Sequence, residues 1–176
     1  MQQLRFLASL RSVRTFTADP VSRDQVEQIV DAARWTGSAR NRQPWRFVAV
    51  SDQVVRRQLS ELGSYAGHLA TAPMVLVVLS EDDGRVDTEF DVGRVSQTIC
   101  LAAHALGLGS CLATLYPQQN VAAAAAILGI RSPWLPRHAI SLGRPRPVER
   151  MGPSTIPRGR LSVDQLLTHV GSASKT

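Results

Sequence analysis

The sequence predicts an α+β protein in which helices flank a small sheet. Short β-branched runs and amphipathic helical segments alternate, but without the regular strand–helix–strand repeat of a doubly wound fold. Residues 74–79 (Met-Val-Leu-Val-Val-Leu) have the length and β-branching of a strand that is buried on both faces. Residues 88–106 form the longest predicted helix, with Val95, Ile99 and Leu106 on one apolar face. These two elements are expected to form the centre of the molecule.

Capping residues and glycines mark the other boundaries. Ser22 and Gln25 form a capping-box pattern, and the helix that they begin is expected to end at Gly37. Asp52 is the expected cap of a short helix. Further helices are expected over 1–10, 121–128 and 162–169, and further strands over 46–50, 110–115 and 139–142. No internal repeat or domain boundary is visible, so residues 1–176 are expected to form a single domain.

The composition limits the classes of function. The chain has 176 residues, of which 44% are hydrophobic, enough to build a core. The net charge of +6 comes almost wholly from arginine, because Lys175 is the only lysine. No nucleic-acid-recognition module accompanies this charge, so a nucleic-acid partner is not expected. The longest apolar run, residues 72–79, is too short to span a membrane, and no signal peptide can be read, so a cytoplasmic location is expected.

Standard catalytic motifs are absent from the sequence. Cys100 and Cys111 lie among apolar residues and are expected to be reduced and structural. The four histidines lack metal-ligand spacing, and His104 is expected to be a packed side chain. Residues 107–109 (Gly-Leu-Gly) follow a predicted helix and lack the third glycine of a dinucleotide loop. We therefore expect no catalytic side chain and no metal, and attribute the chemistry to a bound cofactor.

Two basic segments near opposite ends of the chain suit a phosphate group. Arg11, Ser12 and Arg14 present two guanidinium groups and a hydroxyl, which form charge-assisted hydrogen bonds with phosphate oxygens. An ordinary solvated turn would have the same composition. Arg158 and Arg160 form a second basic pair far along the chain.

A polar segment before the first predicted strand suits a heterocycle. Asn41 and Gln43 each carry a hydrogen-bond donor and an acceptor, which the pyrimidine edge of a heterocycle requires. Ser38 lies nearby in the sequence. The alternative is a polar turn in which Pro44 fixes the backbone and Trp45 enters the core.

Taken in order, these motifs resemble the FMN-dependent nitroreductase family. The resemblance covers roughly residues 4–167 and rests on an ordered set of short motifs rather than on any one of them. The set comprises Arg-Ser-x-Arg-x-Phe from Arg11, Ser-x-x-Asn-x-Gln-Pro-Trp from Ser38, Ala-Pro at 72–73, Leu-Ala-Ala-His-Ala-Leu-Gly-Leu-Gly-Ser at 101–110, Leu-Gly at 142–143 and the basic pair at 158 and 160. It implies a mixed sheet flanked by helices, FMN as cofactor, and an intertwined homodimer formed along the 88–106 helix.

The resemblance also implies roles for individual residues. The cofactor phosphate and ribityl chain would be bound by Arg11, Ser12, Arg14, Arg158 and Arg160. Asn41 matches the residue that bonds the flavin pyrimidine edge, with Ser38 and Gln43 beside it, and this segment can serve the site of the neighbouring subunit. The backbone N–H near Thr114 would face flavin N5, although Thr114 and Leu115 replace the Glu-Gly or Gly-Gly pair frequent there.

The reaction that the family implies is a ping-pong transfer of hydride. NADH or NADPH would reduce FMN and leave, after which a nitroaromatic, quinone or similar small molecule would take the reducing equivalents. Two alternatives remain open: a flavin-binding or sequestering protein with little turnover, and a specialised branch that is deazaflavin-dependent, dehalogenating or flavin-cleaving. Only residues 80–87 occupy the place where many relatives carry an inserted helical lid.

Overall fold

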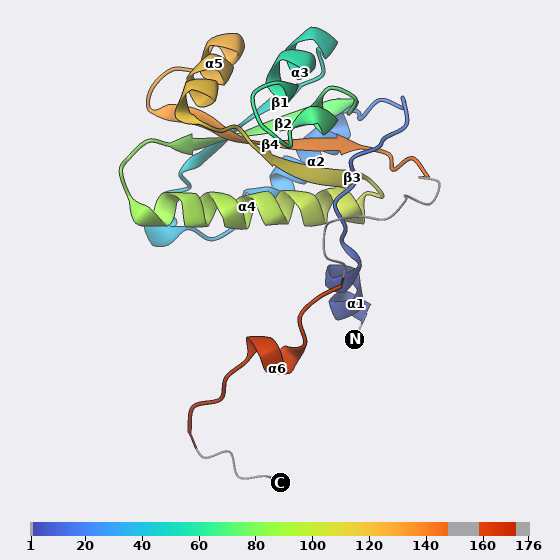
Figure 1. Cartoon of the computed structure of the whole chain (residues 1–176), viewed down its shortest axis with the longest axis vertical. Coiled ribbons are helices and arrows are strands. Elements are labelled where there is room, and N and C mark those ends of the chain that lie inside the picture. Colours follow the sequence, from blue (N-terminus) through green and yellow to red (C-terminus); the bar gives the residue numbers. More distant parts are fainter. Residues whose placement is uncertain (1, 148–158, 172–176) are drawn as a thin grey trace.

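The computed structural model describes residues 2–147 and 159–171 (Figure 1). The helices are α1 (Gln2–Ser9), α2 (Arg23–Ala33), α3 (Gln53–Ser60), α4 (Val86–Ala105), α5 (Gln118–Leu128) and α6 (Val163–Leu166), with short 3₁₀ helices η1 (Ala39–Asn41) and η2 (Gly67–Leu69). The strands are β1 (Trp45–Val50), β2 (Met74–Glu81), β3 (Gly109–Thr114) and β4 (Trp134–Gly143). The predicted α+β class is confirmed.

The four strands form one sheet in the order β1-β2-β4-β3, and each neighbouring pair is antiparallel. A parallel component comes from an isolated bridge between Ser12 and Ser110. Every residue of β2 from Met74 to Ser80 is buried, as its sequence predicts. β2 is buried on both faces because α4 and α2 cover one side of the sheet while α3 and α5 cover the other (Figure 1).

Capping residues and a glycine mark the helix boundaries at several of the expected positions. Ser22 Oγ accepts from the Gln25 N–H over 3.1 Å, and the Ser22 N–H donates to Gln25 Oε1 over 3.0 Å. Asp52 accepts from two N–H groups at the start of α3. Gly107 (φ 72°) follows the end of α4 in the left-handed region, which glycine tolerates without strain. α2 ends at Ala33, before Gly37, because turn-type hydrogen bonds replace the helical ladder there.

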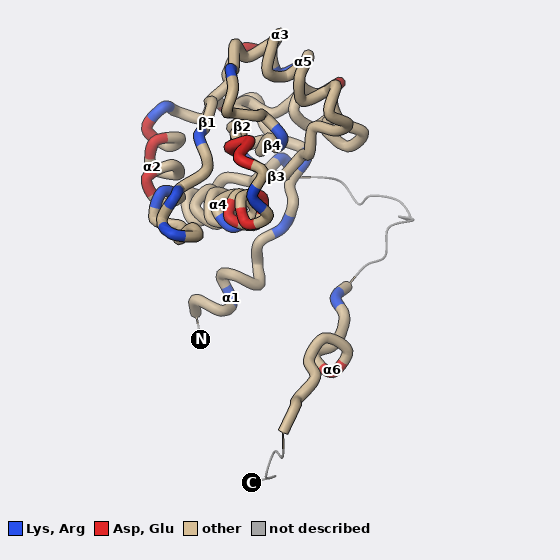
Figure 2. The backbone as a smooth tube through the Cα atoms, turned by 90° about the vertical axis from the view of Figure 1, so that its left-hand side faces the viewer, with Lys and Arg blue, Asp and Glu red and all other residues tan. Residues whose placement is uncertain are grey.

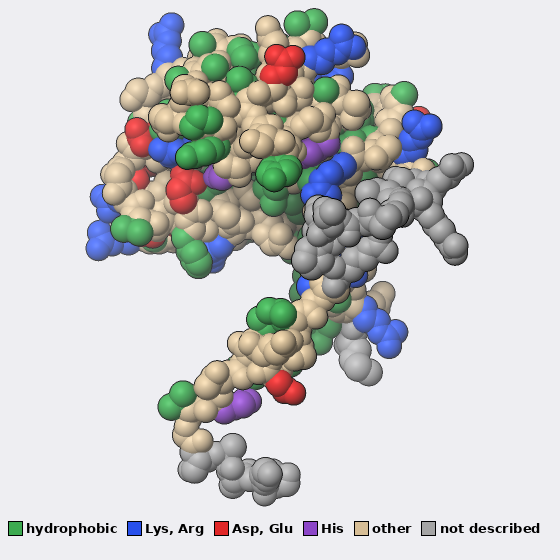
Figure 3. All heavy atoms as spheres, viewed as in Figure 1, with side chains coloured by type: hydrophobic (Ala, Val, Ile, Leu, Met, Phe, Trp, Pro, Cys, Tyr) green, Lys and Arg blue, Asp and Glu red, His purple; other side chains and the backbone are tan. Residues whose placement is uncertain are grey.

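The C-terminal segment differs most from expectation. A helix was expected over 162–169, but α6 comprises only Val163–Leu166, although Ser162 forms its capping box. Its apolar side chains are exposed in the part of the chain that the structure describes, and short helices require apolar packing to persist. Figures 1 and 3 show residues 159–171 extending away from the sheet, with hydrophobic side chains along them.

Buried and packed groups match the structural roles predicted for them. Cys100 and Cys111 are free and buried. His104 stacks on Phe6 with the ring centroids 5.0 Å apart, and its Nε2 lies 2.8 Å from Ser9 Oγ.

Among the described residues, no helix is long and apolar enough to cross a membrane. Within the same residues, no group of three or more His, Cys, Asp or Glu side chains is arranged to hold a metal ion.

Candidate functional site

β3 forms one edge of the sheet, and its backbone groups alternate between β4 and the open side. The Leu115 N–H donates to the Arg137 carbonyl of β4 over 2.9 Å. The preceding residue, Thr114, therefore directs its N–H to the open side, and Leu112 does the same two residues earlier. The Leu112 side chain is 46% exposed. The edge thus offers backbone donors beside an apolar side chain.

A shallow pocket of about 360 Å³ lies against this edge. It is lined by Ser64, Tyr65, Leu112, Ala113, Thr114 and Tyr116. The loop that contains Gly63 approaches β3 closely. A Cβ at Gly63 would lie 2.7 Å from the Thr114 carbonyl oxygen. A side chain at position 63 would therefore push the loop away from the strand.

The predicted phosphate-binding segment lies against the start of β3. The Val13 N–H donates to the Ser110 carbonyl over 2.9 Å, next to the bridge between Ser12 and Ser110. A Cβ at Gly109 would lie 2.7 Å from the Val13 Cβ, so this approach requires glycine. Arg11 donates to two carbonyls at the end of α1. The structure therefore brings Ser12 and its neighbours to the same strand as Thr114.

The charge of Arg14 acts on two buried groups. Burial lowers the pKa of His68, and the Arg14 charge lowers it further. His68 Nδ1 lies 2.8 Å from Ser141 Oγ, while its buried Nε2 has no hydrogen-bond partner among the described residues. Burial raises the pKa of the Cys111 thiol, an effect that Arg14 and a hydrogen bond with Ser12 offset only in part. The raised pKa agrees with a structural rather than a nucleophilic Cys111.

The 38–43 loop has an unusual backbone. Arg40 (φ 53°), Asn41 (φ 55°) and Gln43 (φ 50°) all lie in the left-handed region. Non-glycine residues adopt this conformation at a cost of about 1–3 kcal/mol each, mostly at ligand sites and other functional loops. The Gln43 N–H donates to Ser38 Oγ over 2.9 Å, and the Gln43 side chain donates to Asn41 Oδ1 over 3.2 Å. Three residues predicted from the sequence thus form one hydrogen-bonded group.

Acidic side chains at the start of α4 hold this loop in place. Asp91 is only 2% exposed and accepts from the Ala39 N–H over 2.8 Å. Arg42 pairs with Asp83 at 2.5 Å and also with Asp87. In Figure 2, acidic positions, coloured red, lie near the start of α4. Strong anchoring of this kind allows a strained loop to persist.

The two halves of the predicted site lie at opposite ends of α4. The 38–43 loop contacts the first turns, through residues 83–91. The 9–13 segment contacts the other end, at His104 and at Ser110 just beyond the helix. A 20-residue helix spans about 30 Å, because each residue adds about 1.5 Å. One protomer therefore does not bring the two halves together.

Two further predicted residues, Leu115 and Arg160, are placed differently. Leu115 is 1% exposed and its N–H is used within the sheet, so neither group is available at the open edge. Arg160 lies in the extended segment, where its guanidinium donates to the Gly159 carbonyl over 2.7 Å. Arg158 lies outside the described residues.

Two polar side chains near the edge were not predicted from the sequence. Thr114 Oγ1 lies 3.2 Å from His138 Nδ1, and His138 Nε2 lies 3.1 Å from Glu89 Oε2. Arg137 Nη1 also contacts Glu89, over 2.9 Å. Glu89 is 49 residues from His138 in the sequence, and no motif links them. Only the pairing of β3 with β4, and the position of α4 beneath them, join these groups.

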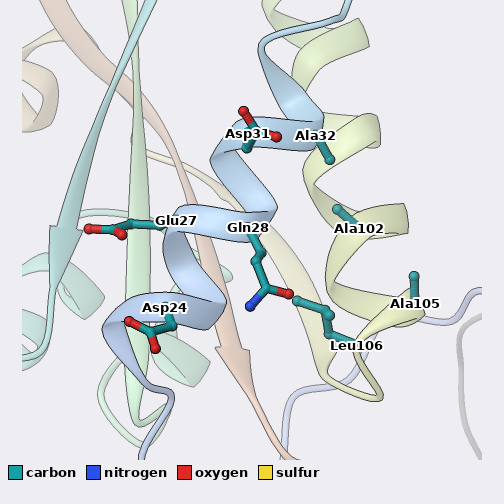
Figure 4. A pocket seen from close by; sticks show the side chains of 8 residues that line it. All are labelled: Asp24, Glu27, Gln28, Asp31, Ala32, Ala102, Ala105 and Leu106. Atoms are coloured by element: carbon teal, nitrogen blue, oxygen red, sulfur yellow. The ribbon is translucent and has the colours of Figure 1, made fainter.

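A second hollow lies elsewhere, between α2 and α4 (Figure 4). It has a volume of about 720 Å³ and is lined by Asp24, Glu27, Gln28, Asp31, Ala32, Ala102, Ala105 and Leu106. Its charged residues are all acidic, which disfavours a phosphorylated ligand. The edge of β3, with its basic neighbouring segment, fits such a ligand better.

A family profile and several curated proteins match this chain. The profile of the nitroreductase family matches residues 7–62 and 60–144. A relative from Archaeoglobus fulgidus, provisionally named an NADH dehydrogenase/NAD(P)H nitroreductase, is 29% identical over 148 residues, covering 81% of this chain and 85% of that protein. A Bacillus subtilis protein named FMN reductase [NAD(P)H] is 28% identical over 78 residues, covering 44% of this chain and 31% of that protein.

A solved structure shares almost the whole fold. It comes from Parabacteroides distasonis, is provisionally named an NADH dehydrogenase/NAD(P)H nitroreductase, and superposes with a TM-score of 0.84 at 25% identity. The superposition covers 97% of this chain and 99% of that one. The fold is that of an α+β protein whose sheet has an open edge at β3. The chain belongs to the nitroreductase family.

Proposed function

We propose that this chain is an FMN-dependent NAD(P)H oxidoreductase that works as a homodimer. Residues 1–176 would form a single flavin-binding domain, and the acceptor would be a nitroaromatic, a quinone or a similar small molecule. The family and the names of the relatives support the class of reaction. The chemistry of hydride transfer would be supplied by bound FMN, while the protein binds and orients it.

The separation of the two half-sites along α4 carries this proposal. If two protomers pair with their α4 helices antiparallel, the start of one helix meets the end of the other. The 38–43 loop of the partner subunit would then lie beside Ser12, Arg14 and the edge of β3. Each cofactor site would thus be completed across the interface, and the dimer would hold two such sites related by symmetry.

The exposed face of α4 fits an interface between copies. Phe90 is 70% exposed, and Gly93, Gln97 and Ala105 follow on the same side of the helix, where all three are exposed. Small and apolar residues on one face allow two helices to approach closely. The apolar side chains of residues 161–170 are also exposed, which supports a partner surface for that segment.

The residues at the edge fit the parts of FMN. Arg14 and Ser12 would bind the phosphate and ribityl chain through charge-assisted hydrogen bonds. Leu112 offers an apolar surface to the ring system, and the Thr114 N–H points to the open edge of the strand two residues further on. From the partner subunit, the side-chain amide of the residue at position 41 would bind the pyrimidine edge.

A spectroscopic titration tests the proposal. The purified protein should contain FMN by mass spectrometry, and its absorbance should bleach when NADH or NADPH is added without oxygen. A quinone or nitroaromatic should then restore the oxidised spectrum. FMN that is bound but not bleached by either nicotinamide would indicate a flavin-sequestering protein, and a bound deazaflavin would indicate the specialised branch.

A further inference from the structure

The hydrogen-bonded chain Thr114–His138–Glu89 has no role in the function proposed above. It joins three elements, since Thr114 ends β3, His138 lies opposite it on β4, and Glu89 lies in the first turn of α4. The two distances, 3.2 and 3.1 Å, are those of hydrogen bonds or close to them. One end of the chain is a hydroxyl at the pocket beside β3, and the other end is a carboxylate.

The charges around His138 determine how the chain is protonated. The hydrogen bond with His138 lowers the pKa of Glu89, and the charge of Arg137 acts in the same direction. Glu89 is therefore an anion that accepts the His138 Nε2–H. That leaves Nδ1 facing the Thr114 hydroxyl, as an acceptor when the ring is neutral and as a donor when it is protonated. Arg137 also contacts Asp82 and Ser80, which fixes its position beside Glu89.

We propose that this chain delivers a proton to the acceptor during the reductase reaction, with His138 as the acid. This inference rests on the proposed function. Reduction of a quinone requires a hydride, taken from the reduced cofactor, and a proton for the carbonyl oxygen of the quinone. The Thr114 O–H bond breaks as its proton forms the O–H bond of the product, and Thr114 takes the proton from Nδ1 of the protonated His138. His138 becomes neutral and regains a proton from water, because its side chain is 27% exposed.

The simpler alternative is a structural cross-strand contact. An exposed histidine–carboxylate pair contributes little to stability, and a Thr–His pair across two strands contributes similarly little. A structural role would affect every reaction of the enzyme alike. A proton-delivery role affects only acceptors that take up a proton.

Two acceptors distinguish these roles. A soluble naphthoquinone needs a proton as well as electrons, whereas ferricyanide takes one electron at a time and no proton. His138→Gln and Thr114→Val should each lower the ratio of quinone to ferricyanide reduction about 100-fold, the lower end of general acid catalysis. His169→Gln is the matched control and should leave the ratio unchanged, because His169 is exposed in the extended segment. Parallel loss with both acceptors, or an unchanged ratio, would overturn the proposal.

A second measurement does not depend on turnover. Nitrogen NMR of the histidine rings in the protein as purified reports which nitrogen carries the proton, and His138→Gln assigns the signal. We expect the Nε2-protonated form in the wild type and in Thr114→Val, and a mixture of the two forms in Glu89→Ala. A neutral ring protonated at Nδ1 in the wild type would overturn the proposed direction of transfer. Failure of NADH and NADPH to reduce a bound flavin would instead refute the proposed function.

Discussion

The carboxylate of Asp91, buried in α4, accepts a 2.8 Å hydrogen bond from the backbone N–H of Ala39. Together with the ion pair between Arg42 and Asp87, this bond joins the strained 38–43 loop to α4. Arg94 also contacts the same carboxylate, at 3.2 Å. The loop conformation therefore depends on a charge that its own sequence does not contain.

Removal of this carboxylate should loosen the loop. We expect Asp91→Ala to lower the free energy of unfolding by about 1.5–3 kcal/mol, the range for hydrogen bonds to charged groups. Affinity for FMN should fall as well, because the Ser38, Asn41 and Gln43 group would lose its anchor. Urea denaturation and flavin titration measure the two effects. Asp31→Ala is the control, since Asp31 makes only an exposed pair with Arg34; equal losses in both variants would contradict this role of Asp91.

Arg14 should be needed for cofactor binding but not for folding. Its side chain is exposed beside β3, so Arg14→Ala should weaken FMN binding by about 1.5–3 kcal/mol with little change in melting temperature. Titration of the apoprotein with FMN, followed by flavin fluorescence, gives the affinity. Arg23→Ala on α2 serves as control because Arg23 is exposed on the helix surface, where it pairs with Glu27. Unchanged affinity in Arg14→Ala would show that the phosphate is bound elsewhere.

Asn41 should control the reduction potential of the flavin. Asn41→Asp replaces a donor with a negative charge that repels the reduced flavin, so the potential should fall and reduction by NADH should slow. Asn41→Ala should change the potential less, but it also places alanine in a left-handed conformation, which costs about 1–2 kcal/mol.

Asn41→Gly separates these two effects. Glycine tolerates the φ of 55° at this position, so the melting temperature should stay near that of the wild type while the donor is lost. Spectroelectrochemistry and thermal denaturation on all three variants decide the matter. A wild-type potential combined with lowered melting temperatures would limit Asn41 to a role in the turn.

Gly93 offers a direct test of the dimer. It lies on the exposed face of α4, and a Cβ there would meet no atom within 4 Å. Gly93→Ala should therefore fold normally, whereas Gly93→Arg should fold but place a charged chain in the proposed interface. We expect sedimentation velocity to show a dimer for the wild type and a flavin-free monomer for Gly93→Arg. Gln58→Arg on α3 is the control, and a flavin-loaded dimer of Gly93→Arg would refute this interface.

His68 should make stability depend on pH. Burial lowers its pKa from the ordinary 6.5 in the folded state, so the unfolded chain binds the proton more readily. Stability is therefore fully present above about pH 6.5 and falls as the pH decreases toward the folded pKa. Urea denaturation between about pH 8 and pH 5 should show this slope. His68→Gln should flatten it, and the same slope in both proteins would assign the effect to other groups.

The sequence by itself determined the elements and much of the candidate site. Capping at Ser22, the buried run of β2 and the glycine after α4 are local signals, and each acts through its own backbone or its immediate neighbours. Ser38, Asn41 and Gln43 were singled out together as candidate cofactor contacts because they lie within six residues, and the structure joins them by hydrogen bonds. Residues this close in sequence can form hydrogen bonds with one another without any contribution from the rest of the fold.

Only the tertiary structure decided which distant groups meet. The Leu115 N–H points to β4 rather than to the open edge. In an antiparallel pair, successive N–H groups of a strand point alternately toward and away from the neighbouring strand. α6 is short because its apolar residues are exposed among residues 2–147 and 159–171, and a capping signal cannot replace apolar packing. The Thr114–His138–Glu89 chain depends on the register of β3 with β4 and on the first turn of α4. Register and packing arise from contacts between segments that are far apart in sequence. A single short motif therefore does not predict them.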